Sequence, residues 1–313
     1  MYDTIIVGSG IAGISSAIYA ARKDMDFKLL SSNFAGQINM VGEVKNYPGF
    51  SKVGWKELKN RLEEQMKENK IEWEKERVRE IKPILDHFVV ETRDRTYRTR
   101  TVVLATGARP RRLKVPGEAK LTNRGVSYCA ICDAPDYEGK DVAVIGGGNS
   151  AVEATDFLCN HANKIYIINK NERFKCHEAL GDSLENESIE VIKEARVKEI
   201  RGEESVRGLI YEKDGRKERI DVEGVFPAIG TEPNTKFLRG LVEMNEQGNI
   251  VVDKDCRTSQ PGIFAAGDCT DSPDQLAVAA GQGATALIKA AEAIRNERIR
   301  KMDYDLVSAI CSL

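Results

Sequence analysis

Two cysteines and an aspartate lie close together near the middle of the chain. Cys129 and Cys132 are separated by two residues, and Asp133 follows at once. Cysteines at this spacing can close a small disulfide ring, and disulfide exchange needs one thiolate to attack while the other thiol resolves the mixed disulfide. The leaving thiolate must be protonated, and a carboxyl group near a thiol pair can have its pKa raised enough for this task near neutral pH. The stretch therefore predicts a redox-active thiol pair with Asp133 as its acid–base group.

A zinc half-site is the alternative for the same two thiols. A structural zinc site needs a second pair of ligands. The remaining cysteines supply no second pair at this spacing, and His161 and His177 are weak substitutes. Those remaining cysteines are Cys159, Cys176, Cys256, Cys269 and Cys311. We therefore expect disulfide chemistry and no metal.

A glycine-rich turn near the start of the chain is typical of dinucleotide binding. An apolar run at 2–7 precedes the turn, and an alanine-rich segment with helical spacing follows it at 14–22. In such a unit the first glycine makes the turn, the second lets the backbone approach a pyrophosphate, and the third permits close helix packing. The candidate residues are Gly8, Ser9, Gly10, Ile11, Ala12 and Gly13. A turn that merely needs small residues is the alternative, because the next strand ends at Ser31 where an acidic ribose ligand is expected.

A second turn of the same kind follows the cysteine pair. The apolar run 141–145 leads into a G-x-G-x-x-A pattern and a predicted helix over 152–158. The candidate residues are Gly146, Gly148, Asn149, Ser150 and Ala151. The two turns begin 138 residues apart, which is 146 minus 8, and two copies in one chain make coincidence a poor explanation for either. One site can hold a tightly bound flavin and the other an exchanging nicotinamide.

The end of the next strand, at 164–168, should choose between NADH and NADPH. An acidic residue there would bind a ribose 2′-hydroxyl, whereas cationic residues would accept a 2′-phosphate. Position 169 is an asparagine, and Lys170, Arg173 and Lys175 carry positive charge. This pattern favours NADPH, with plain surface charge as the alternative.

Other stretches can contact a large cofactor. Two apolar strands end in small residues, one before Ala105, Thr106 and Gly107 and the other before Gly267 and Asp268, whose carboxylate can bind cofactor hydroxyls. A helix predicted over 275–293 would point the positive end of its dipole at an anion, such as a reduced flavin ring.

Short antiparallel strands are expected over 71–100, and an amphipathic helix over 57–69. The basic run at 109–114 is a solvated linker or a docking patch for an acidic protein.

The bulk composition describes a globular chain of two domains. A length of 313 residues exceeds one ordinary core. Lysine and arginine number 47 against 49 acidic residues, a net charge of -2, so we expect no binding to nucleic acid or to a membrane. Neither a spanning run nor a signal peptide is recognised, and the seven cysteines do not form a secreted framework. These features predict a cytoplasmic protein.

Taken together, these motifs resemble the low-molecular-weight thioredoxin reductase family over nearly the whole chain. The matching residues also include Gly36, Gln37 and Asn46, and Gln275 and Leu276 at the start of the last helix. The resemblance implies an α/β fold of two Rossmann-like dinucleotide-binding domains, each with the three-layer ββα architecture of FAD- and NAD(P)-binding folds. It implies a discontinuous FAD domain at 1–114 and 245–313, and an NAD(P)H domain at 115–244 that carries the cysteine pair.

The same resemblance implies a role for each site residue. Cys132 would lie against the flavin, Cys129 would attack a protein disulfide, and Asp133 would be the acid–base residue. The FAD ligands would come from the first glycine turn and the other loops named above, and the nicotinamide ligands from the second turn with Lys170 and Lys175. Family members are usually homodimers, and their partner is thioredoxin or a thioredoxin-like or glutaredoxin-like protein.

One family motif departs from the pattern. The usual HRRxxxR phosphate-binding run is here Asn169-Lys170-Asn171 with Lys175 in the last position. Lysine is a point charge that cannot reproduce the forked contacts of arginine. NADPH therefore stays the expected donor of a thioredoxin-disulfide reductase, with NADH, ferredoxin or a reduced deazaflavin as alternatives. A non-catalytic flavin redox sensor is a further alternative, against which two complete nucleotide motifs and the thiol pair argue.

Overall fold

The computed structural model describes residues 1–40, 43–174 and 187–311, with side chains for all of these except 40 and 297–311. The chain forms two compact units. Unit 1 comprises residues 1–41, 47–109 and 232–313, and unit 2 comprises residues 42–46 and 110–231. Unit 1 is therefore assembled from separate stretches of sequence. The assignment of a cofactor to each unit, with the domain limits expected for it, remains a prediction.

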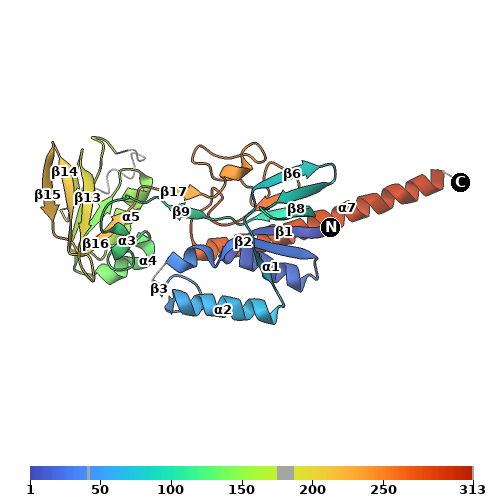
Figure 1. Cartoon of the computed structure of the whole chain (residues 1–313), viewed down its shortest axis with the longest axis horizontal. Helices are drawn as coiled ribbons and strands as arrows, with labels where there is room; N and C mark the ends of the chain where they lie inside the picture. Colours follow the sequence, from blue (N-terminus) through green and yellow to red (C-terminus); the bar gives the residue numbers. More distant parts are fainter. Residues whose placement is uncertain (41–42, 175–186, 312–313) are drawn as a thin grey trace. The chain divides into compact units, whose positions relative to one another are not determined.

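Unit 1 is built on a seven-stranded sheet with the order β5-β2-β1-β8-β7-β6, in which β18 also pairs with β8 (Figure 1). β1 is parallel to β2 on one side and to β8 on the other. Parallel strands are covered on both faces and read as continuous apolar runs, and Ile5 and Ile6 of β1 are both fully buried. The strands of this sheet are β1 (Tyr2–Ser9), β2 (Phe27–Phe34), β5 (Trp73–Lys75), β6 (Glu80–Ile84), β7 (His87–Glu91), β8 (Thr96–Leu104) and β18 (Ile263–Ala265). Unit 1 also contains the short strand β4 (Val53–Gly54), which lies outside this sheet.

Two helices pack together beside this sheet, α1 (Ile11–Arg22) and α7 (Leu276–Cys311). The Ser16 hydroxyl of α1 donates to the Gly283 carbonyl of α7 at 2.7 Å. A Cβ atom at Gly283 would lie 2.1 Å from the Ala12 carbonyl oxygen, so this crossing requires glycine. α2 (Trp55–Glu68) buries Leu58, Leu62 and Met66 on one face, which confirms the predicted amphipathic helix. The short helices are η1 (Gly36–Met40) and η4 (Lys236–Leu238).

Unit 2 contains a four-stranded parallel sheet, β12-β11-β10-β16, and a three-stranded antiparallel sheet, β13-β14-β15. Val142 and Val144 of β10 are fully buried, as expected for a central parallel strand. Its strands are β3 (Glu43–Val44), β10 (Asp141–Ile145), β11 (Lys164–Ile168), β12 (Ile189–Ile192), β13 (Arg196–Arg201), β14 (Gly208–Lys213), β15 (Arg216–Ile220) and β16 (Gly224–Pro227). Its helices are α3 (Glu118–Leu121), α4 (Ala130–Asp133), η2 (Ala134–Tyr137) and α5 (Asn149–Cys159). Where the chain passes between the units, β9 (Ala108–Pro110) pairs with β17 (Thr231–Pro233).

Each unit places a glycine turn between a central parallel strand and a helix, which confirms the predicted α/β class. The segment 71–100 does not form a separate antiparallel insert as expected. β6 and β7 are antiparallel strands, but they continue the main sheet, and β5 is parallel to β2. The reason is the length of β8, whose first residues pair with β7 and whose last residues pair with β1 and β18. Among the helices that the structure describes, none combines the length and apolarity needed to cross a membrane.

Candidate active site

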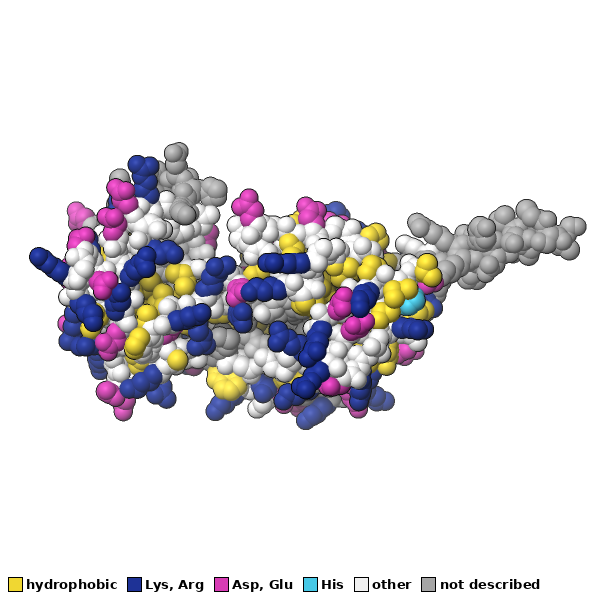
Figure 2. Space-filling model, turned by 45° about the horizontal axis from the view of Figure 1, so that its top comes forward, with side chains coloured by type: hydrophobic (Ala, Val, Ile, Leu, Met, Phe, Trp, Pro, Cys, Tyr) yellow, Lys and Arg dark blue, Asp and Glu magenta, His cyan; other side chains and the backbone are white. Residues whose placement is uncertain are grey.

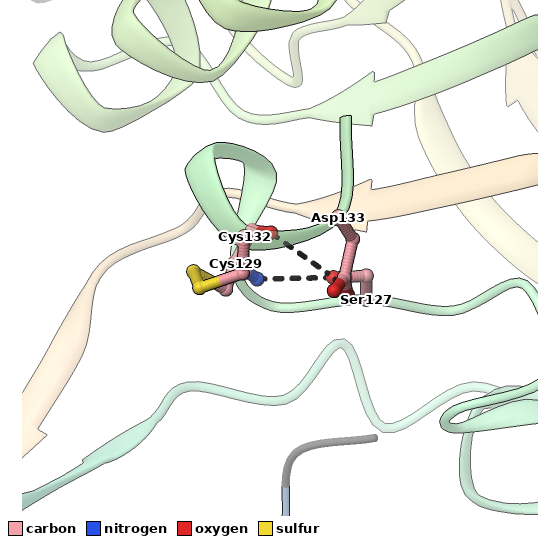
Figure 3. The surroundings of a disulfide bond; sticks show 4 residues. All are labelled: Ser127, Cys129, Cys132 and Asp133. Carbon is pink, nitrogen blue, oxygen red and sulfur yellow. Dashed lines mark hydrogen bonds between the residues drawn. A yellow bond between two sulfur atoms is a disulfide. The ribbon is translucent and has the colours of Figure 1, made fainter. Parts of the chain in front are cut away.

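The two cysteines of the central motif form a disulfide at the start of α4 (Figure 3). Their Cα atoms are 5.3 Å apart. The amides of Cys132 and Asp133 both donate to the Cys129 carbonyl, at 3.2 and 3.1 Å, so a single helical turn closes the ring. Cys129, Cys132 and Asp133 are half-buried, while Ile131 between the cysteines is 39% exposed. The disulfide is therefore held on a short helical turn at an accessible position.

A serine that sequence analysis did not single out connects the acid to this turn. The Ser127 hydroxyl donates to the Asp133 carboxylate at 2.6 Å and accepts from the Cys129 amide at 3.1 Å (Figure 3). A serine two residues before an amide can form such a turn, which is the signal that the sequence offered. Burial raises the pKa of Asp133 above its usual range, and the Ser127 hydrogen bond opposes the shift. The acid–base role of Asp133 stays a prediction, and the raised pKa is the direction of shift that this role needs.

Charged side chains of unit 2 surround this carboxyl group. Asp136 and Glu43 raise its pKa through their negative charge, whereas Lys45 lowers it. Lys45 forms an ion pair with Asp136 and lies 4.0 Å from Glu43. Charges of both signs therefore act on Asp133, and burial is the largest cause of its raised pKa.

A buried glutamate anchors the residue before the first cysteine. Glu118 is only 3% exposed, and its carboxylate accepts hydrogen bonds from the Leu113 and Lys114 amides at 2.8 and 2.7 Å. It also accepts from the Tyr128 hydroxyl at 2.8 Å. Burial and this hydrogen bond raise the pKa of Tyr128 to about 12, so the phenol stays a donor. The basic run of the sequence is thereby joined to the redox turn through Glu118, a residue that sequence analysis missed.

The first glycine turn has the shape expected of a pyrophosphate site. A Cβ atom at Gly8 would lie 2.1 Å from the Ala105 carbonyl oxygen, and one at Gly13 would lie 1.8 Å from the Gly8 carbonyl oxygen. At Gly10, in contrast, no atom lies within 4 Å of the position of a Cβ. Gly8 and Gly13 therefore serve close packing, while Gly10 leaves open backbone at the start of α1, where a phosphate can bind.

Other predicted flavin ligands gather at the same turn. A Cβ atom at Gly36 would lie 3.2 Å from the Gly10 Cα. The Gln37 amide donates to the Asp268 carboxylate at 2.5 Å, although 231 residues separate the two in sequence. Burial raises the pKa of Asp268. Gly267 packs on the same region, since its Cβ would lie 3.1 Å from the Ala12 Cβ. These residues of unit 1 fit a nucleotide cofactor.

The remaining members of the predicted flavin set are placed differently. Ser9 donates from its hydroxyl to the Asn33 carbonyl at 2.6 Å, so its side chain fixes the end of β2. The Thr106 and Gly107 carbonyls accept from Asn234, and Gln275 and Leu276 stand at the start of α7. Asn46 belongs to the segment 42–46 of unit 2, so the structure does not group it with the others.

The second glycine turn is formed by unit 2. A Cβ atom at Gly146 would lie 2.3 Å from the Ala228 carbonyl oxygen and 3.0 Å from the Ala151 Cβ, so position 146 has no room for a side chain. Helix α5 begins at Asn149, and Gly148, Ser150 and Ala151 lie at its first turn. The turn therefore leaves a helix N-terminus available for a phosphate.

The strand end that should select the nicotinamide nucleotide carries a buried, uncharged side chain. Asn169 is 1% exposed; its amide donates to the Arg173 carbonyl at 3.1 Å and accepts from the Asn171 amide at 3.1 Å. Both polar groups of Asn169 are therefore engaged by its own loop. Lys170 and Arg173 are exposed, and Lys175 lies outside the described residues.

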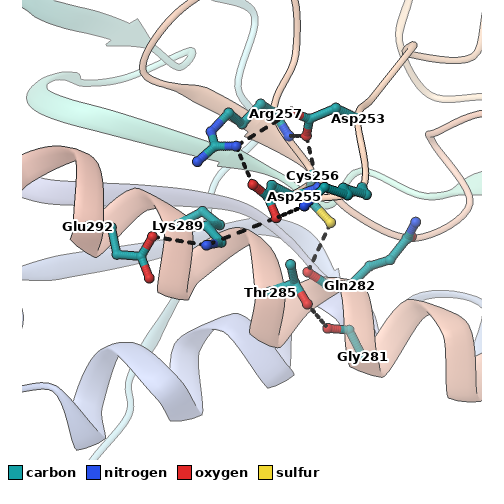
Figure 4. Close-up of polar contacts among 10 residues, drawn as sticks. Asp253, Asp255, Cys256, Arg257, Gly281, Gln282, Thr285, Lys289 and Glu292 are labelled. Atoms are coloured by element: carbon teal, nitrogen blue, oxygen red, sulfur yellow. Dashed lines mark hydrogen bonds and ion pairs between the residues drawn. The ribbon is translucent and has the colours of Figure 1, made fainter.

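The other described cysteines form no second redox centre. Cys159, Cys256 and Cys269 are free thiols, and burial raises the pKa of Cys256 to about 11. The Cys256 thiol contacts the Gln282 carbonyl at 3.6 Å within a network of ion pairs (Figure 4). Cys176 is outside the described residues, and in the part of the chain with described side chains no cluster of histidine, cysteine and acidic groups could hold a metal.

The chain is similar to known flavoenzymes over most of its length. A model of the pyridine nucleotide-disulphide oxidoreductase family matches residues 2–283. A thioredoxin reductase of Listeria monocytogenes is 35% identical over 91% of this chain and 92% of its own length. An NADH dehydrogenase of Bacillus subtilis is 40% identical over 92% of this chain, but the match spans only 58% of that longer protein.

A solved structure agrees with the sequence matches. The crystal structure of thioredoxin reductase from Streptococcus pyogenes superimposes with a TM-score of 0.89 and 35% identity, covering 95% of this chain and 99% of the other. Its fold of two dinucleotide-binding domains is the one predicted here. The chain therefore belongs to the pyridine nucleotide-disulphide oxidoreductase family, in its low-molecular-weight thioredoxin reductase group.

Proposed function

We propose that this protein is a thioredoxin-disulfide reductase that takes electrons from NADPH. The observation that supports this most is the Cys129–Cys132 disulfide beside a half-buried carboxyl group, in a chain with two glycine turns of dinucleotide-binding shape. The family implies a flavin and a nicotinamide nucleotide, and the similarity to thioredoxin reductases supports thioredoxin or a thioredoxin-like or glutaredoxin-like protein as partner.

The flavin would be held by unit 1 and the nicotinamide nucleotide by unit 2. Gly10 would lie under the pyrophosphate of FAD, and Asp268 would bind its hydroxyl groups, with Gln37 holding the carboxylate. The second turn, with Asn149 and Ser150 at the start of α5, would take the nicotinamide nucleotide. When bound, the two groups would supply hydride transfer and an electron pair for the disulfide.

The thiol pair and its carboxyl group carry the rest of the reaction. Cys132 is proposed to take electrons on the flavin side, and Cys129 to attack the disulfide of the partner. The Cys129 thiolate bonds to one partner sulfur, the partner's other sulfur leaves, and Cys132 then displaces the reduced partner and restores the disulfide. Asp133 supplies the proton that a leaving thiolate needs, which its raised pKa favours.

NADH is the second candidate for the donor. Asn169 offers no charge, and its side chain is engaged within its own loop, so the 2′-phosphate would rely on exposed cations such as Lys170. Exposed single charges contribute about 1 kcal/mol or less, which is weak discrimination. The similarity to a protein named NADH dehydrogenase is consistent with this alternative. We also propose that the protein is cytoplasmic and that it forms a homodimer.

Anaerobic stopped-flow mixing tests the donor and the reductase function together. The flavin-loaded protein is mixed with NADPH, with NADH or with buffer, and the bleaching of the flavin is followed before oxidised thioredoxin is added. Fast bleaching by NADPH and its reversal by thioredoxin are expected. If dithionite bleaches the flavin but neither nucleotide does, the electron donor is of another kind and the proposal is wrong in that part.

A further inference from the structure

The hydroxyl of Ser127 joins the acid–base group to the first cysteine in one hydrogen-bonded unit. Its oxygen is 2.6 Å from the Asp133 carboxylate and 3.1 Å from the Cys129 amide nitrogen. An amide can only donate, so the Cys129 amide contact uses a lone pair of the hydroxyl. The hydroxyl proton has two acceptors within reach, the Asp133 carboxylate at 2.6 Å and the Cys129 carbonyl at 3.4 Å, and the shorter contact to the carboxylate is the stronger one. Ser127 thus has one geometry that satisfies both neighbours.

The backbone of Ser127 is fixed independently of these side-chain bonds. Its amide donates to the Val225 carbonyl of β16 at 3.0 Å, and Val126 forms a bridge with the same residue. Ser127 is only 6% exposed. A hydroxyl on a buried, strand-anchored backbone can hold a flexible carboxylate more firmly than water could.

The Asp133 carboxylate does not face the sulfur atoms while the disulfide is closed. In the view of Figure 3, the sulfur atoms and the Asp133 carboxylate project to opposite sides of the turn, with the carboxylate directed toward Ser127. The hydrogen bond therefore sets where the carboxylate rests while the disulfide is closed.

We propose that Ser127 is a positioning residue for disulfide exchange, holding the Asp133 carboxylate at a fixed place relative to Cys129. The role rests on the proposed function of Asp133 as acid–base group. The other groups that face Asp133 are Asp136 and Glu43, Lys45 and the Tyr137 phenol, and all of them are retained when only Ser127 is changed.

The role can be measured on a reaction that needs no nucleotide or protein partner. A dithiothreitol thiolate attacks one sulfur of the disulfide, and the second sulfur leaves as a thiolate, to which Asp133 supplies the proton through a water molecule. The second dithiothreitol thiol then closes its own ring and releases the other cysteine. Dithiothreitol is oxidised by two electrons and the Cys129–Cys132 disulfide is reduced to two thiols.

The experiment compares Ser127→Ala with Ser127→Thr, which keeps a hydroxyl, and with Ser205→Ala as a matched serine change elsewhere in unit 2. The titration of Asp133 is followed by carbon-13 NMR of the full chain labelled at its aspartate carboxyl groups, and Asp133→Asn identifies the signal. Loss of a hydrogen bond to a carboxylate should raise the Ser127→Ala midpoint by about one pH unit. Reduction by dithiothreitol at neutral pH, read by thiol alkylation and mass, should slow roughly tenfold.

Ser127→Thr and Ser205→Ala should retain the parent midpoint and rate. An unchanged midpoint in Ser127→Ala, or a shifted midpoint with an unchanged rate, would overturn the positioning role. If Ser127→Ala does not fold, Ser127→Gly must show the same two changes. Because neither readout uses thioredoxin or a nicotinamide nucleotide, a failure here is distinct from a failure of the proposed electron donor or partner.

Discussion

At the scale of single residues, burial separates reactive groups from inert ones. Cys129 and Cys132 are half-buried beside an exposed Ile131. Cys256 and Cys269 are buried, and burial raises the pKa of both thiols, so they stay protonated and unreactive at neutral pH. The same effect raises the pKa of Asp133, which brings this carboxyl group closer to the range in which it can transfer protons near neutral pH.

The raised pKa of Asp133 has a consequence for stability that Asp133→Asn should reveal. A carboxyl group with a native pKa above its unfolded value binds protons more tightly in the folded state, so it costs stability as pH rises through that range. The cost is complete above the native pKa and absent below the unfolded one. Asp133→Asn should therefore have a higher Tm than the parent at pH 7, by a margin that shrinks as the pH falls toward about 4.

Thermal unfolding across this pH range checks the sign of the effect. Disulfide exchange by the same variant should slow by roughly 10²-fold or more, the usual contribution of a general acid. A variant that is less stable than the parent at pH 7 would show that Asp133 is held mainly by favourable contacts and that its raised pKa has been misassigned.

At the scale of elements, the glycines of one turn have different tasks. Gly13 has no space for a Cβ, whereas Gly10 has open space and an ordinary φ of -69°. Spacing alone predicted the turn, but it could not show which glycine faces a ligand. Gly13 is closed by the Gly8 carbonyl of its own turn, whereas Gly8 is closed by the carbonyl of Ala105, which follows β8 and lies far away in sequence.

Matched alanine substitutions test this division of tasks. Gly13→Ala should destabilise unit 1 by about 2 kcal/mol or more, because its methyl group meets a backbone carbonyl. Gly10→Ala should fold like the parent but retain FAD roughly tenfold more weakly, since the methyl group enters the space of the pyrophosphate. Circular dichroism and flavin absorbance after dialysis measure the two properties. If Gly10→Ala keeps its flavin as firmly as the parent, the pyrophosphate does not bind there.

The loop at 113–118 offers a second test at this scale. Glu118, which is itself buried, accepts from two backbone amides and from Tyr128. Glu118→Ala leaves three donors without a partner and should cost about 3 kcal/mol in the free energy of unfolding, whereas Tyr128→Phe removes one donor and should cost about 1 kcal/mol. Urea unfolding measures both values. Equal losses from the two changes would contradict the view that Glu118 organises the loop.

How far the sequence predicts the molecule also differs between elements. The parallel strands, the two glycine turns and the cysteine pair were predicted, because each depends on a short local pattern. The contacts of Ser127 and Glu118 were missed, because a single serine or glutamate gains its role only from the neighbours that the fold supplies. The pairing of β5 with β2 was likewise invisible, since strand partners are set by the whole sheet.

At the scale of the whole molecule, the chain joins two units of similar plan with different expected ligands. The proposed flavin ligands come from both ends of the sequence, because residues 232–313 return to unit 1 and place Asp268 beside Gln37. The redox turn lies in unit 2 with the second glycine turn. The B. subtilis relative, of which the match spans 58%, contains further sequence, so partner choice in this chain must be measured directly.

The most direct test of the account is a half-reaction with Cys129→Ser. Parent and variant are loaded with FAD, reduced anaerobically by one equivalent of dithionite and mixed with oxidised thioredoxin, while flavin reoxidation and new thioredoxin thiols are recorded. The parent should be reoxidised in step with the appearance of thioredoxin thiols, and Cys129→Ser should keep its reduced flavin and yield none. If the variant reduces thioredoxin as fast as the parent, electrons do not pass through the Cys129–Cys132 pair and the proposed mechanism is wrong.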